Sequence, residues 1–377
     1  MAFAKDYIDR MAAGEEHKVL RTGWTTGACA AAAARAAYEK LVTGIFPDPV
    51  TILLPGGERP SFALAFEDSG PDFASAGIIK DAGDDPDVTH GALVIARVSP
   101  GITGSGLVFR AGEGVGTITR AGLPLPPGEP AINPMPRQML AAALAEVAVI
   151  HATSTDLIVE ISIPGGAKIA ERTLNGRLGI IGGLSILGTT GIVVPYSCSA
   201  WIHSIHRGID VARAAGLDHI TGSTGSTSEA AVRALHGLPE IALIDMGDFV
   251  GGMLKYLRRH RIAKVTIAGG FAKLTKLGQG LLDLHSRRGA VDFAWLAARV
   301  AEAGGDEALV KRTLHANTAK EVSDLALLRG IDIGSLVAEA AWRTAAKALH
   351  GSDIALEIVI FDRDGGLIAR TPFRQVH

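Results

Sequence analysis

The sequence predicts two domains in succession, an α+β domain over residues 1–180 and an α/β domain with a mainly parallel sheet over residues 181–377. The chain of 377 residues is long enough for two hydrophobic cores. Its first part contains several strand-like runs in succession with only two helices, which is typical of an α+β domain. In the second part, short apolar strands alternate with amphipathic helices, the pattern of a parallel sheet covered on both faces.

The first domain opens with an alanine-rich helix in the stretch RTGWTTGACAAAAARAA, residues 21–37. Thr25 or Thr26 can cap this helix, and the alanines propagate it at low entropic cost. One interpretation is a buried helix packed closely against a sheet. In the other, the helix start uses its unpaired amides and partial positive charge to bind a carboxylate or phosphate. Thr25, Thr26 and Gly27 are therefore candidate substrate-binding residues.

The other elements of the first domain are separated by Gly, Pro and Asp turns. We expect its strands at residues 50–55, 61–67, 73–80, 92–99, 107–111 and 156–164. A second helix is expected at about 138–149, after the proline-rich segment 122–137.

Because each proline fixes its own φ and restricts the residue before it, this segment is stiff. It is either a rigid connector or a template for a ligand. Asn133 can start the helix or hydrogen-bond a ligand, and Arg137 can hold a carboxylate with two N–H groups. Both are candidate substrate-binding residues.

In the second domain we expect helices at 198–215, 227–236 and 248–260, strands at 241–246 and 264–270, and a final hairpin over 355–370. Residues 178–202 contain no Asp, Glu, Lys or Arg and are long enough to span a membrane. Their glycines and Pro195 favour short buried strands joined by tight turns instead.

A loop rich in Gly, Ser and Thr follows a short strand near residue 220 and opens a helix, so that backbone amides face a ligand. Its candidate cofactor-binding residues are Gly222, Thr224, Gly225 and Ser226. Neither GxGxxG nor GxxxxGK[ST] is present, so neither a dinucleotide fingerprint nor a Walker loop is supported.

Two aspartates beyond this loop are further cofactor candidates. Asp245, twenty residues after Gly225, can accept bonds from ribose hydroxyls or simply end a strand in solvent. Asp248 can contact the cofactor or cap the helix that begins there.

The segment KDAGDDPDVTHGA, residues 80–92, holds four aspartates and a histidine. It is a solvated turn, a substrate-orienting or proton-handling site, or a Mg²⁺ or Ca²⁺ site, although its spacing is not that of an EF-hand. In the second case, Asp84, Asp85 and His90 are catalytic candidates, because crowded carboxylates beside a histidine shift one another's pKa values.

His285, with Arg287 and Arg288 beside it, can bind a substrate carboxylate or lie at a helix end that faces water. The net charge of −2 recruits neither nucleic acid nor an anionic membrane, so any anionic ligand depends on local groups. Cys29 and Cys198 form neither a CxxC pair nor a His-clustered zinc site, as expected in a reducing cytoplasm. The first eighteen residues mix both signs of charge and lack the apolar core of a secretory signal.

Seven longer segments, ordered along the chain, are more specific than any of these loop motifs. They are LRTGWTTGACAAAAARAA (20–37), KDAGDDPDVTHGA (80–92), GVGTITRAGLPLPPGEPAINPMPR (114–137), TLNGRLGIIGGLSILGTTGIV (173–193), TGSTSE (224–229), MGDFVG (246–251) and KLTKLGQGLLDLHSRRGAVD (273–292). Together they resemble the CbiD family, the cobalt-precorrin-5B C(1)-methyltransferases of cobalamin biosynthesis.

The resemblance implies a first domain similar to the ribosomal S5 domain 2-like fold and an α/β second domain. It implies S-adenosylmethionine as methyl donor, an anionic corrin precursor as acceptor, and a cytoplasmic enzyme without a protein-bound metal, any cobalt belonging to the substrate. Many members carry histidine in a Gly-His-x-Gly-Lys segment where this chain reads Gly270-Phe271-Ala272-Lys273, so no catalytic histidine is assigned there.

Two other functions stay open on the sequence. A nucleotide-dependent precorrin reductase would use the Gly222 to Gly225 loop and bind NADPH. A non-catalytic carrier would bind the corrin intermediate without S-adenosylmethionine. The partners expected are the small-molecule substrate, and a second copy of the chain or neighbouring pathway enzymes in transient contact.

Overall fold

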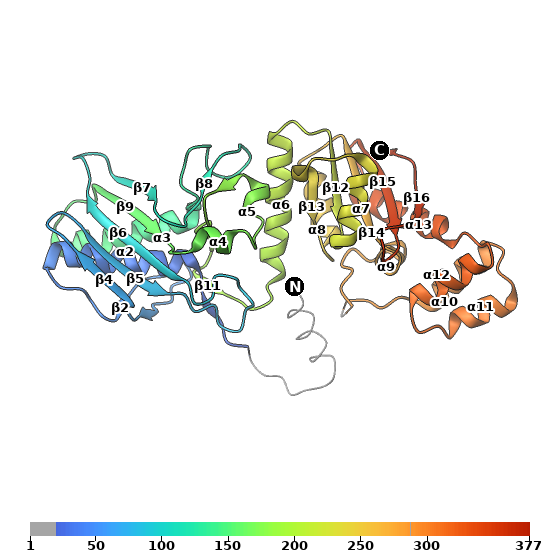
Figure 1. Ribbon diagram of the computed structural model, residues 1–377, viewed down its shortest axis with the longest axis horizontal. Coiled ribbons are helices and arrows are strands. Elements are labelled where there is room, and N and C mark those ends of the chain that lie inside the picture. Colours follow the sequence, from blue (N-terminus) through green and yellow to red (C-terminus); the bar gives the residue numbers. More distant parts are fainter. Residues whose placement is uncertain (1–19, 287) are drawn as a thin grey trace. The chain divides into compact units, whose positions relative to one another are not determined.

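A computed structural model describes residues 20–286 and 288–377 (Figure 1). Residues 1–19, in which no secretory signal was expected, and Arg287 lie outside the described residues. The chain divides into two compact units, Met1–Ser197 and Cys198–His377. Residues 181–197, placed by the sequence in the second domain, belong to the first unit, because their strands pair with strands of that unit.

The first unit is built on a five-stranded sheet in which only one pair of neighbours is parallel. The order is β4-β5-β6-β9-β7, with β7 and β9 parallel and the other neighbours antiparallel. The strands are β4 (Phe66–Ser69), β5 (Ala74–Ile79), β6 (Leu93–Pro100), β7 (Leu107–Ala111) and β9 (Leu157–Ser162). This confirms the expected succession of strands.

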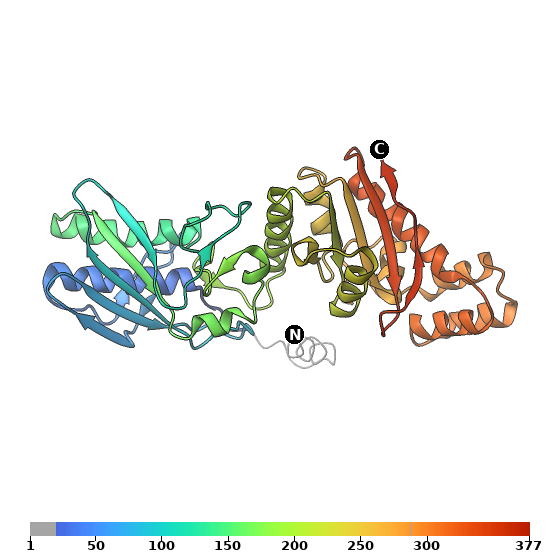
Figure 2. The same ribbon diagram turned by 45° about the horizontal axis from the view of Figure 1, so that its top comes forward.

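Two long helices complete the core of the first unit, α2 (Thr26–Thr43) and α3 (Pro134–His151). Helix α2 packs on β5 and β6 and lies beside α3 (Figure 2). Every residue from Ala28 to Ala34 is fully buried, including the thiol of Cys29, whose pKa burial raises to about 12. Small side chains let the helix approach the strands closely, so the buried-helix interpretation is confirmed.

Short elements frame this core. Three two-stranded ladders are β1 (Gly23–Trp24) with β11 (Ile192–Val193), β2 (Val50–Thr51) with β3 (Ser61–Phe62), and β8 (Thr117–Ile118) with β10 (Ile180–Ile181). The helices α4 (Gly166–Ala170) and α5 (Asn175–Leu178) lie between β9 and β10. The strand expected at 50–55 is shorter than predicted and ends at Thr51. Beyond it the chain still bonds across the hairpin, from Ile52 N to Pro60 O at 3.2 Å and from Leu54 N to Glu58 O at 2.9 Å, before a tight turn.

The second unit contains the expected mainly parallel sheet. The order is β13-β12-β14-β15-β16, with β17 also pairing β15; β12 to β15 are parallel, and β16 and β17 run antiparallel to β15. The strands are β12 (His219–Ser223), β13 (Leu243–Asp245), β14 (Lys264–Gly270), β15 (Ile354–Phe361), β16 (Leu367–Arg370) and β17 (Arg374–Val376).

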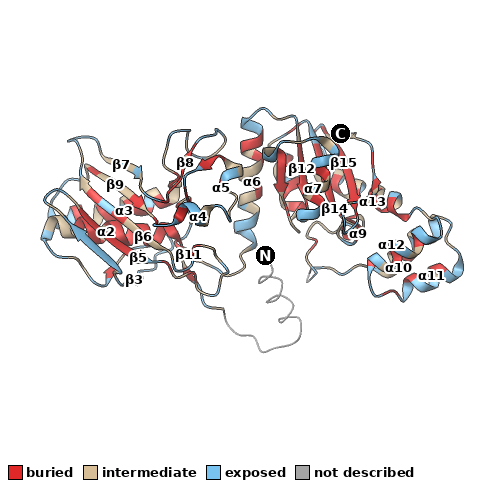
Figure 3. Ribbon diagram, in the orientation of Figure 1, coloured by how far each residue is buried: buried red, intermediate tan, exposed pale blue. Residues whose placement is uncertain are grey.

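Helices cover both faces of this sheet. They are α7 (Ser226–His236) on one face and α6 (Cys198–Ala214), α8 (Val250–Leu257), α9 (Phe271–Gly278) and α13 (Ile333–Leu349) on the other. The 3-10 turn η1 (Glu240–Ala242) contacts α6, and α10 (Phe293–Glu302), α11 (Glu307–Leu314) and α12 (Ala319–Leu328) form a group that packs on α9 and α13. The larger core lies on the face covered by α6, α8, α9 and α13. Figure 3 shows buried residues along the strands of this sheet and along α2. On the opposite face, Val232 of α7 packs on Ala268, Val359 and Phe361.

The uncharged stretch 178–202 is divided among the end of α5, β10, β11 and the start of α6. In the described part of the chain, no helix has both the length and the apolar character needed to cross a membrane.

The sheet face below α7 carries buried polar side chains. Glu357 of β15 is fully buried; its Oε2 accepts from Thr266 Oγ1 at 2.8 Å and lies 2.7 Å from His236 Nε2. Its Oε1 lies 3.1 Å from Arg370 Nη2. Burial lowers the pKa of His219 to about 4, so this ring is neutral near pH 7. Because Thr266 gives its hydrogen to Glu357, His219 Nε2 donates to Thr266 Oγ1, 2.9 Å away.

We predict that Glu357→Ala lowers the free energy of unfolding by about 3–5 kcal/mol, because it removes the acceptor shared by His236 and Thr266 and the ion-pair partner of Arg370. Asp324→Ala, which breaks an exposed pair with Lys320 one helical turn away, should change it by less than about 1 kcal/mol. Urea denaturation of both variants measures the difference. Equal stability of the two variants would contradict a structural role for Glu357.

Candidate functional site

The strand order of the second unit defines one candidate ligand edge. From β12 the chain continues to β13 on one side of it and then returns to β14 on the other. The carboxyl ends of β12 and β14 are therefore a topological switch point. Open α/β sheets bind ligands in the crevice outside such a point.

Two glycines leave the backbone at this edge open. Gly225 precedes α7 and Gly270 precedes α9, and a Cβ on either would meet nothing within 4 Å. Thr224 lies beside them, with its amide donating to Ala268 O at 3.0 Å, and Ser226 is the first residue of α7. A ligand can approach the main chain closely here. These contacts keep Thr224, Gly225 and Ser226 as candidates.

Gly222 is different, because it lies within β12 and faces the core. A Cβ there would lie 2.3 Å from Met253 Sδ and 2.8 Å from Met246 Sδ. Its missing side chain makes room for packing against two methionines, so the structure gives Gly222 a packing role and not a ligand contact.

The two aspartates predicted at this edge lie in different surroundings. Asp245 ends β13, and its carbonyl accepts from Trp201 Nε1 at 3.0 Å. Asp248 forms an ion pair with Lys273, and its carbonyl accepts from Leu284 N at 2.9 Å. Asp248 does not cap α8, because that helix begins at Val250 with Phe249 as its N-cap residue.

Two lysines of α9 that the sequence analysis did not single out converge here. Lys273 Nζ and Lys276 Nζ lie 3.3 and 3.1 Å from the same carbonyl, Leu284 O. Burial, and then the neighbouring Lys273, lower the pKa of Lys276. The signal that could have found them is their i, i+3 spacing in the first turns of a helix after a strand and a glycine pair.

His285 lies in the same unit, in the segment between α9 and α10. Its amide donates to Asp283 Oδ1 at 3.1 Å, and Arg288 Nε lies 3.7 Å from Asp283 Oδ2. The other predicted substrate-binding residues belong to the first unit. Arg287, predicted beside His285, lies outside the described residues.

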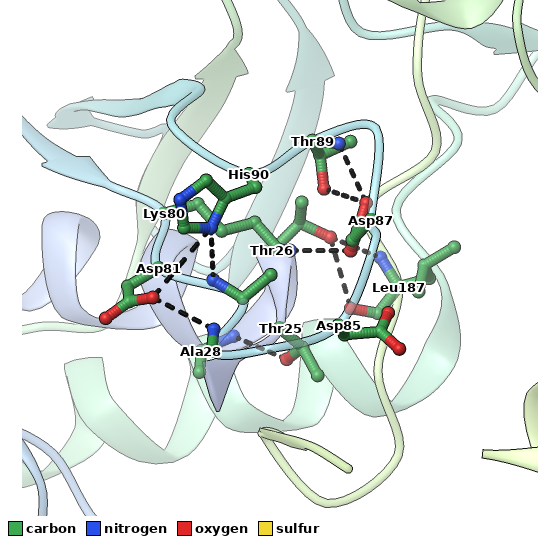
Figure 4. A network of polar contacts seen from close by, with 12 residues as sticks. Thr25, Thr26, Ala28, Lys80, Asp81, Asp85, Asp87, Thr89, His90 and Leu187 are labelled. Atoms are coloured by element: carbon green, nitrogen blue, oxygen red, sulfur yellow. Dashed lines mark hydrogen bonds and ion pairs between the residues drawn. The ribbon is translucent and has the colours of Figure 1, made fainter. Parts of the chain in front are cut away.

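In the first unit, the start of α2 uses its donors internally (Figure 4). Thr25 caps the helix by accepting from Ala28 N at 3.2 Å. Gly27 N donates to Leu187 O at 3.1 Å, and Leu187 N donates to Thr26 Oγ1 at 3.0 Å. The segment around Leu187 thus covers the helix start. The sequence analysis considered the amides at this helix start as donors to an anion. The amides of Gly27 and Ala28 are instead bonded within the protein.

The segment 80–92 folds into a loop fixed from inside by a buried lysine (Figure 4). Lys80 is 1% exposed, and its Nζ lies 2.6 Å from Asp87 Oδ2. Thr89 donates its amide and its hydroxyl to Asp87 Oδ1, each at 2.7 Å. Two backbone hydrogen bonds of 2.8 Å, from Lys80 N to Ala92 O and from Gly91 N to Lys80 O, join the two ends of the loop. The sequence analysis did not predict this Lys80–Asp87 pair. The signal that could have indicated it is a lysine at the end of an apolar strand.

The three catalytic candidates lie together on this loop. Asp84 is exposed, and its Oδ2 accepts from Arg21 N at 2.8 Å. Asp85 Oδ1 accepts from Tyr196 N at 2.8 Å, and burial raises the pKa of Asp85. His90 is exposed, and its Nδ1 accepts from Ala82 N at 3.1 Å, so a neutral ring carries its hydrogen on Nε2. Burial of Asp85 therefore favours its protonated form more than it does for an exposed aspartate.

The loop does not assemble a metal site from its aspartates. Across residues 20–286 and 288–377, no three His, Cys, Asp or Glu side chains are grouped so that they could hold a metal ion.

The proline-rich segment is held by Arg137. Its Nε donates to Ile132 O at 2.8 Å, and its Nη2 donates to Glu129 Oε2 at 2.8 Å and to Pro130 O at 3.2 Å. The sequence analysis expected Arg137 to hold a substrate carboxylate. In the structure, Arg137 instead holds the carboxylate of Glu129, in the same segment. Asn133 is the N-cap residue of α3 but makes no capping bond with its side chain, which leaves that amide group a candidate ligand contact.

The architecture is that of a two-unit protein whose second unit is an open α/β sheet with a topological switch point. A CbiD sequence profile matches residues 13–195, and a profile described as "CbiD, C-terminal domain" matches residues 283–372. The chain is 62% identical over 354 residues to the cobalt-precorrin-5B C(1)-methyltransferase of Bradyrhizobium sp. (strain BTAi1), with 94% of each chain covered. It is 63% identical over 355 residues to the protein of that name from Methylorubrum extorquens, covering 94% of this chain and 98% of the relative.

The chain therefore belongs to the CbiD family. A solved structure titled as a cobalamin biosynthesis protein (cbiD) from Archaeoglobus fulgidus is 26% identical, covers 71% of this chain and 83% of its own, and superposes with a TM-score of 0.39.

We predict that Arg137→Ala lowers the free energy of unfolding by about 2 kcal/mol, because it frees two carbonyls and Glu129 from their donor. Arg110→Ala is the matched control, since Arg110 is exposed on β7 and no hydrogen bond to another described residue is recorded for its side chain. Urea denaturation measures both. Unchanged stability with weakened corrin binding would restore the ligand interpretation of Arg137.

Asp85→Asn and Asp87→Asn are predicted to differ in their effect on stability, with a loss expected for Asp87→Asn alone. Burial raises the pKa of Asp85, so its ionisation opposes folding once the pH exceeds the ordinary aspartate value of about 3.9. An asparagine keeps an oxygen for the Tyr196 amide, so Asp85→Asn should be at least as stable as the natural protein at pH 7.

For Asp87, burial acts to raise the pKa, but Lys80 and Thr89 together lower it. Its carboxylate therefore contributes stability above about pH 3.9 that is lost as the pH falls through its folded pKa. Asp87→Asn should cost about 3 kcal/mol at pH 7, and unfolding at pH 3 should show a smaller difference for both variants. A loss for Asp85→Asn equal to that for Asp87→Asn would refute the assignment.

Proposed function

We propose that this protein transfers a methyl group from S-adenosylmethionine to C1 of cobalt-precorrin-5B, or of its metal-free counterpart, during corrin ring biosynthesis. The observation that carries the proposal is 62% identity over 94% of the chain to a protein named for this activity. The corrin precursor, which carries several carboxylate arms, is the substrate, and any cobalt arrives with it.

We assign the methyl donor to the carboxyl edge of the parallel sheet in the second unit. In support, the edge is a topological switch point, Gly225 and Gly270 leave its backbone open, and Asp245 ends the neighbouring strand. An acidic residue at that place can accept bonds from ribose hydroxyls.

We assign the corrin substrate to the first unit, with the loop 80–92 and Asn133 as its contacts. In support, Asp84 and His90 are exposed on a loop whose shape is fixed by the Lys80–Asp87 pair, and the side chain of Asn133 does not cap its helix. A loop held in this way presents its polar groups in a fixed geometry.

Methyl transfer is an in-line displacement at the sulfonium. An electron pair of the ring forms the new bond from C1 to the methyl carbon, while the pair of the breaking C–S bond stays on sulfur and leaves S-adenosylhomocysteine. Such a step requires alignment and exclusion of water more than a protein nucleophile. If the methylated ring then releases a proton, Asp85 is our candidate acceptor, because burial raises its pKa.

Two finer assignments accompany this proposal. We propose that the first unit shares the ribosomal S5 domain 2-like fold, in support of which its mostly antiparallel sheet packs with two long helices. We also propose a cytoplasmic enzyme, in keeping with the free thiols of Cys29 and Cys198.

The test combines binding and turnover. Calorimetric titration is expected to show binding of S-adenosylhomocysteine but not of NADPH, and methyl-labelled donor should label cobalt-precorrin-5B. Binding of NADPH without S-adenosylhomocysteine would replace the proposal with a reductase. Binding of the corrin with neither nucleoside and without label transfer would replace it with a carrier.

A further inference from the structure

The start of α7 keeps several donors unused. The helix has eleven residues, and its N-cap residue, Gly225, has no side chain to cap it. Glu229 N is the first amide with a partner, Gly225 O at 3.0 Å. The amides of Ser226, Thr227 and Ser228 have no acceptor among the described residues. These donors lie at the positive end of the helix dipole.

A buried hydroxyl lies next to this helix start. Ser223, two residues before Gly225, is 1% exposed, and its Oγ has no hydrogen-bond partner among the described residues. Side chains alternate along β12, and Gly222 faces Met253 on the larger core, so Ser223 faces the side covered by α7. Its carbonyl accepts from the amides of Met246 and Gly247 at 3.1 and 3.2 Å, which fixes the residue in place.

A buried hydroxyl without a partner costs free energy in the folded protein and requires an explanation. A bound ligand supplies one, if it accepts hydrogen bonds from both the hydroxyl and the amides. A carboxylate has this chemistry, and a helix start is favourable for its charge.

The surroundings favour a carboxylate over a phosphate. The loop lacks the lysine of a Walker sequence, which would neutralise the larger charge of a phosphate. Asp245 is the register partner of Ser223 on β13, so its side chain lies on the same face of the sheet. A phosphate dianion would be repelled there more strongly than the single charge of a carboxylate.

We propose that Ser223 and the first-turn amides of α7 bind a carboxylate group of a ligand. Under the proposed function, on which the inference rests, this group is the α-carboxylate of the methyl donor, which we assigned to this edge of the sheet. An acetate or propionate arm of the corrin precursor is the other source of a carboxylate, and the experiment below distinguishes the two. Ser223 is then a ligand contact at the sheet edge, beyond the loop residues that the glycine pattern indicates.

The experiment uses the full chain and calorimetric titration with three probes. They are S-adenosylhomocysteine, its decarboxylated analogue, and cobyrinic acid as a stable corrin with free carboxylates. For the donor source, Ser223→Ala should weaken binding of S-adenosylhomocysteine about tenfold and leave the decarboxylated analogue unchanged. For the substrate source, only cobyrinic acid should bind more weakly.

Stability separates this role from a structural one. Because the Ser223 hydroxyl has no described partner, Ser223→Ala should keep or raise the melting temperature while affinity falls. Thr221→Val is the matched control, since Thr221 is fully buried on the same strand and its Oγ1 also has no partner among the described residues. It should keep or raise the melting temperature and keep the affinity.

A second variant tests the amides independently. Ser226→Pro removes one N–H at the first position of a helix, where proline is tolerated, and should weaken binding of the same probe as Ser223→Ala. The inference is overturned if neither S-adenosylhomocysteine nor cobyrinic acid loses affinity in these variants. Failure of S-adenosylhomocysteine to bind even the natural protein would refute the assigned methyl donor, and the cobyrinic acid titrations would then decide the carboxylate site alone.

Discussion

Close packing of a helix made of small residues is the constraint on which the first unit depends. Every side chain from Ala28 to Ala34 is buried, and α2 contacts both β5 and β6 while it lies beside α3. Larger side chains at these positions would force the helix away from the strands. The start of the helix is fixed as well, because Thr26 and Gly27 bond the main chain of Leu187. The core and the segments around it therefore have one consistent arrangement.

The two units differ in how their polar groups are used. In the first unit, buried polar groups of the loop 80–92 have partners within the protein. Lys80 is paired to Asp87, and the Asp85 carboxylate accepts from a backbone amide. In the second, the carboxyl edge of the sheet has first-turn amides and a buried hydroxyl without described partners. Polar groups that are paired at rest give a surface a fixed shape, whereas unpaired ones favour the arrival of a ligand.

The sequence predicted elements well where local signals agree. The strand at 107–111, the strand at 264–270 and the helix from 198 have the expected limits within one residue. Helix α3 begins at Pro134 with Asn133 as its N-cap residue, which confirms the interpretation that Asn133 starts the helix. It begins four residues before the start expected at about 138, because prolines are compatible with the first turn of a helix. A rule that treats proline only as a helix breaker does not predict a helix that begins with prolines.

Site residues were harder to predict because their roles depend on partners distant in the chain. Arg137 has the right chemistry to hold a carboxylate, but its carboxylate is Glu129, eight residues away. Gly222 fits a ligand loop by spacing, but Met253 occupies the space beside it. The sequence pattern identifies side chains and glycines that are suited to contact a ligand. Whether such a group contacts a ligand or a neighbouring residue depends on the fold.

The burial of Cys29 has a practical consequence. Its thiol lies inside α2 with a pKa raised to about 12, whereas Cys198 is exposed. Thiol reagents attack thiolates, so in the folded protein they reach Cys198 and not Cys29. Labelling of Cys29 therefore requires the central helix of the first unit to open, and its rate reports how often that helix leaves the sheet.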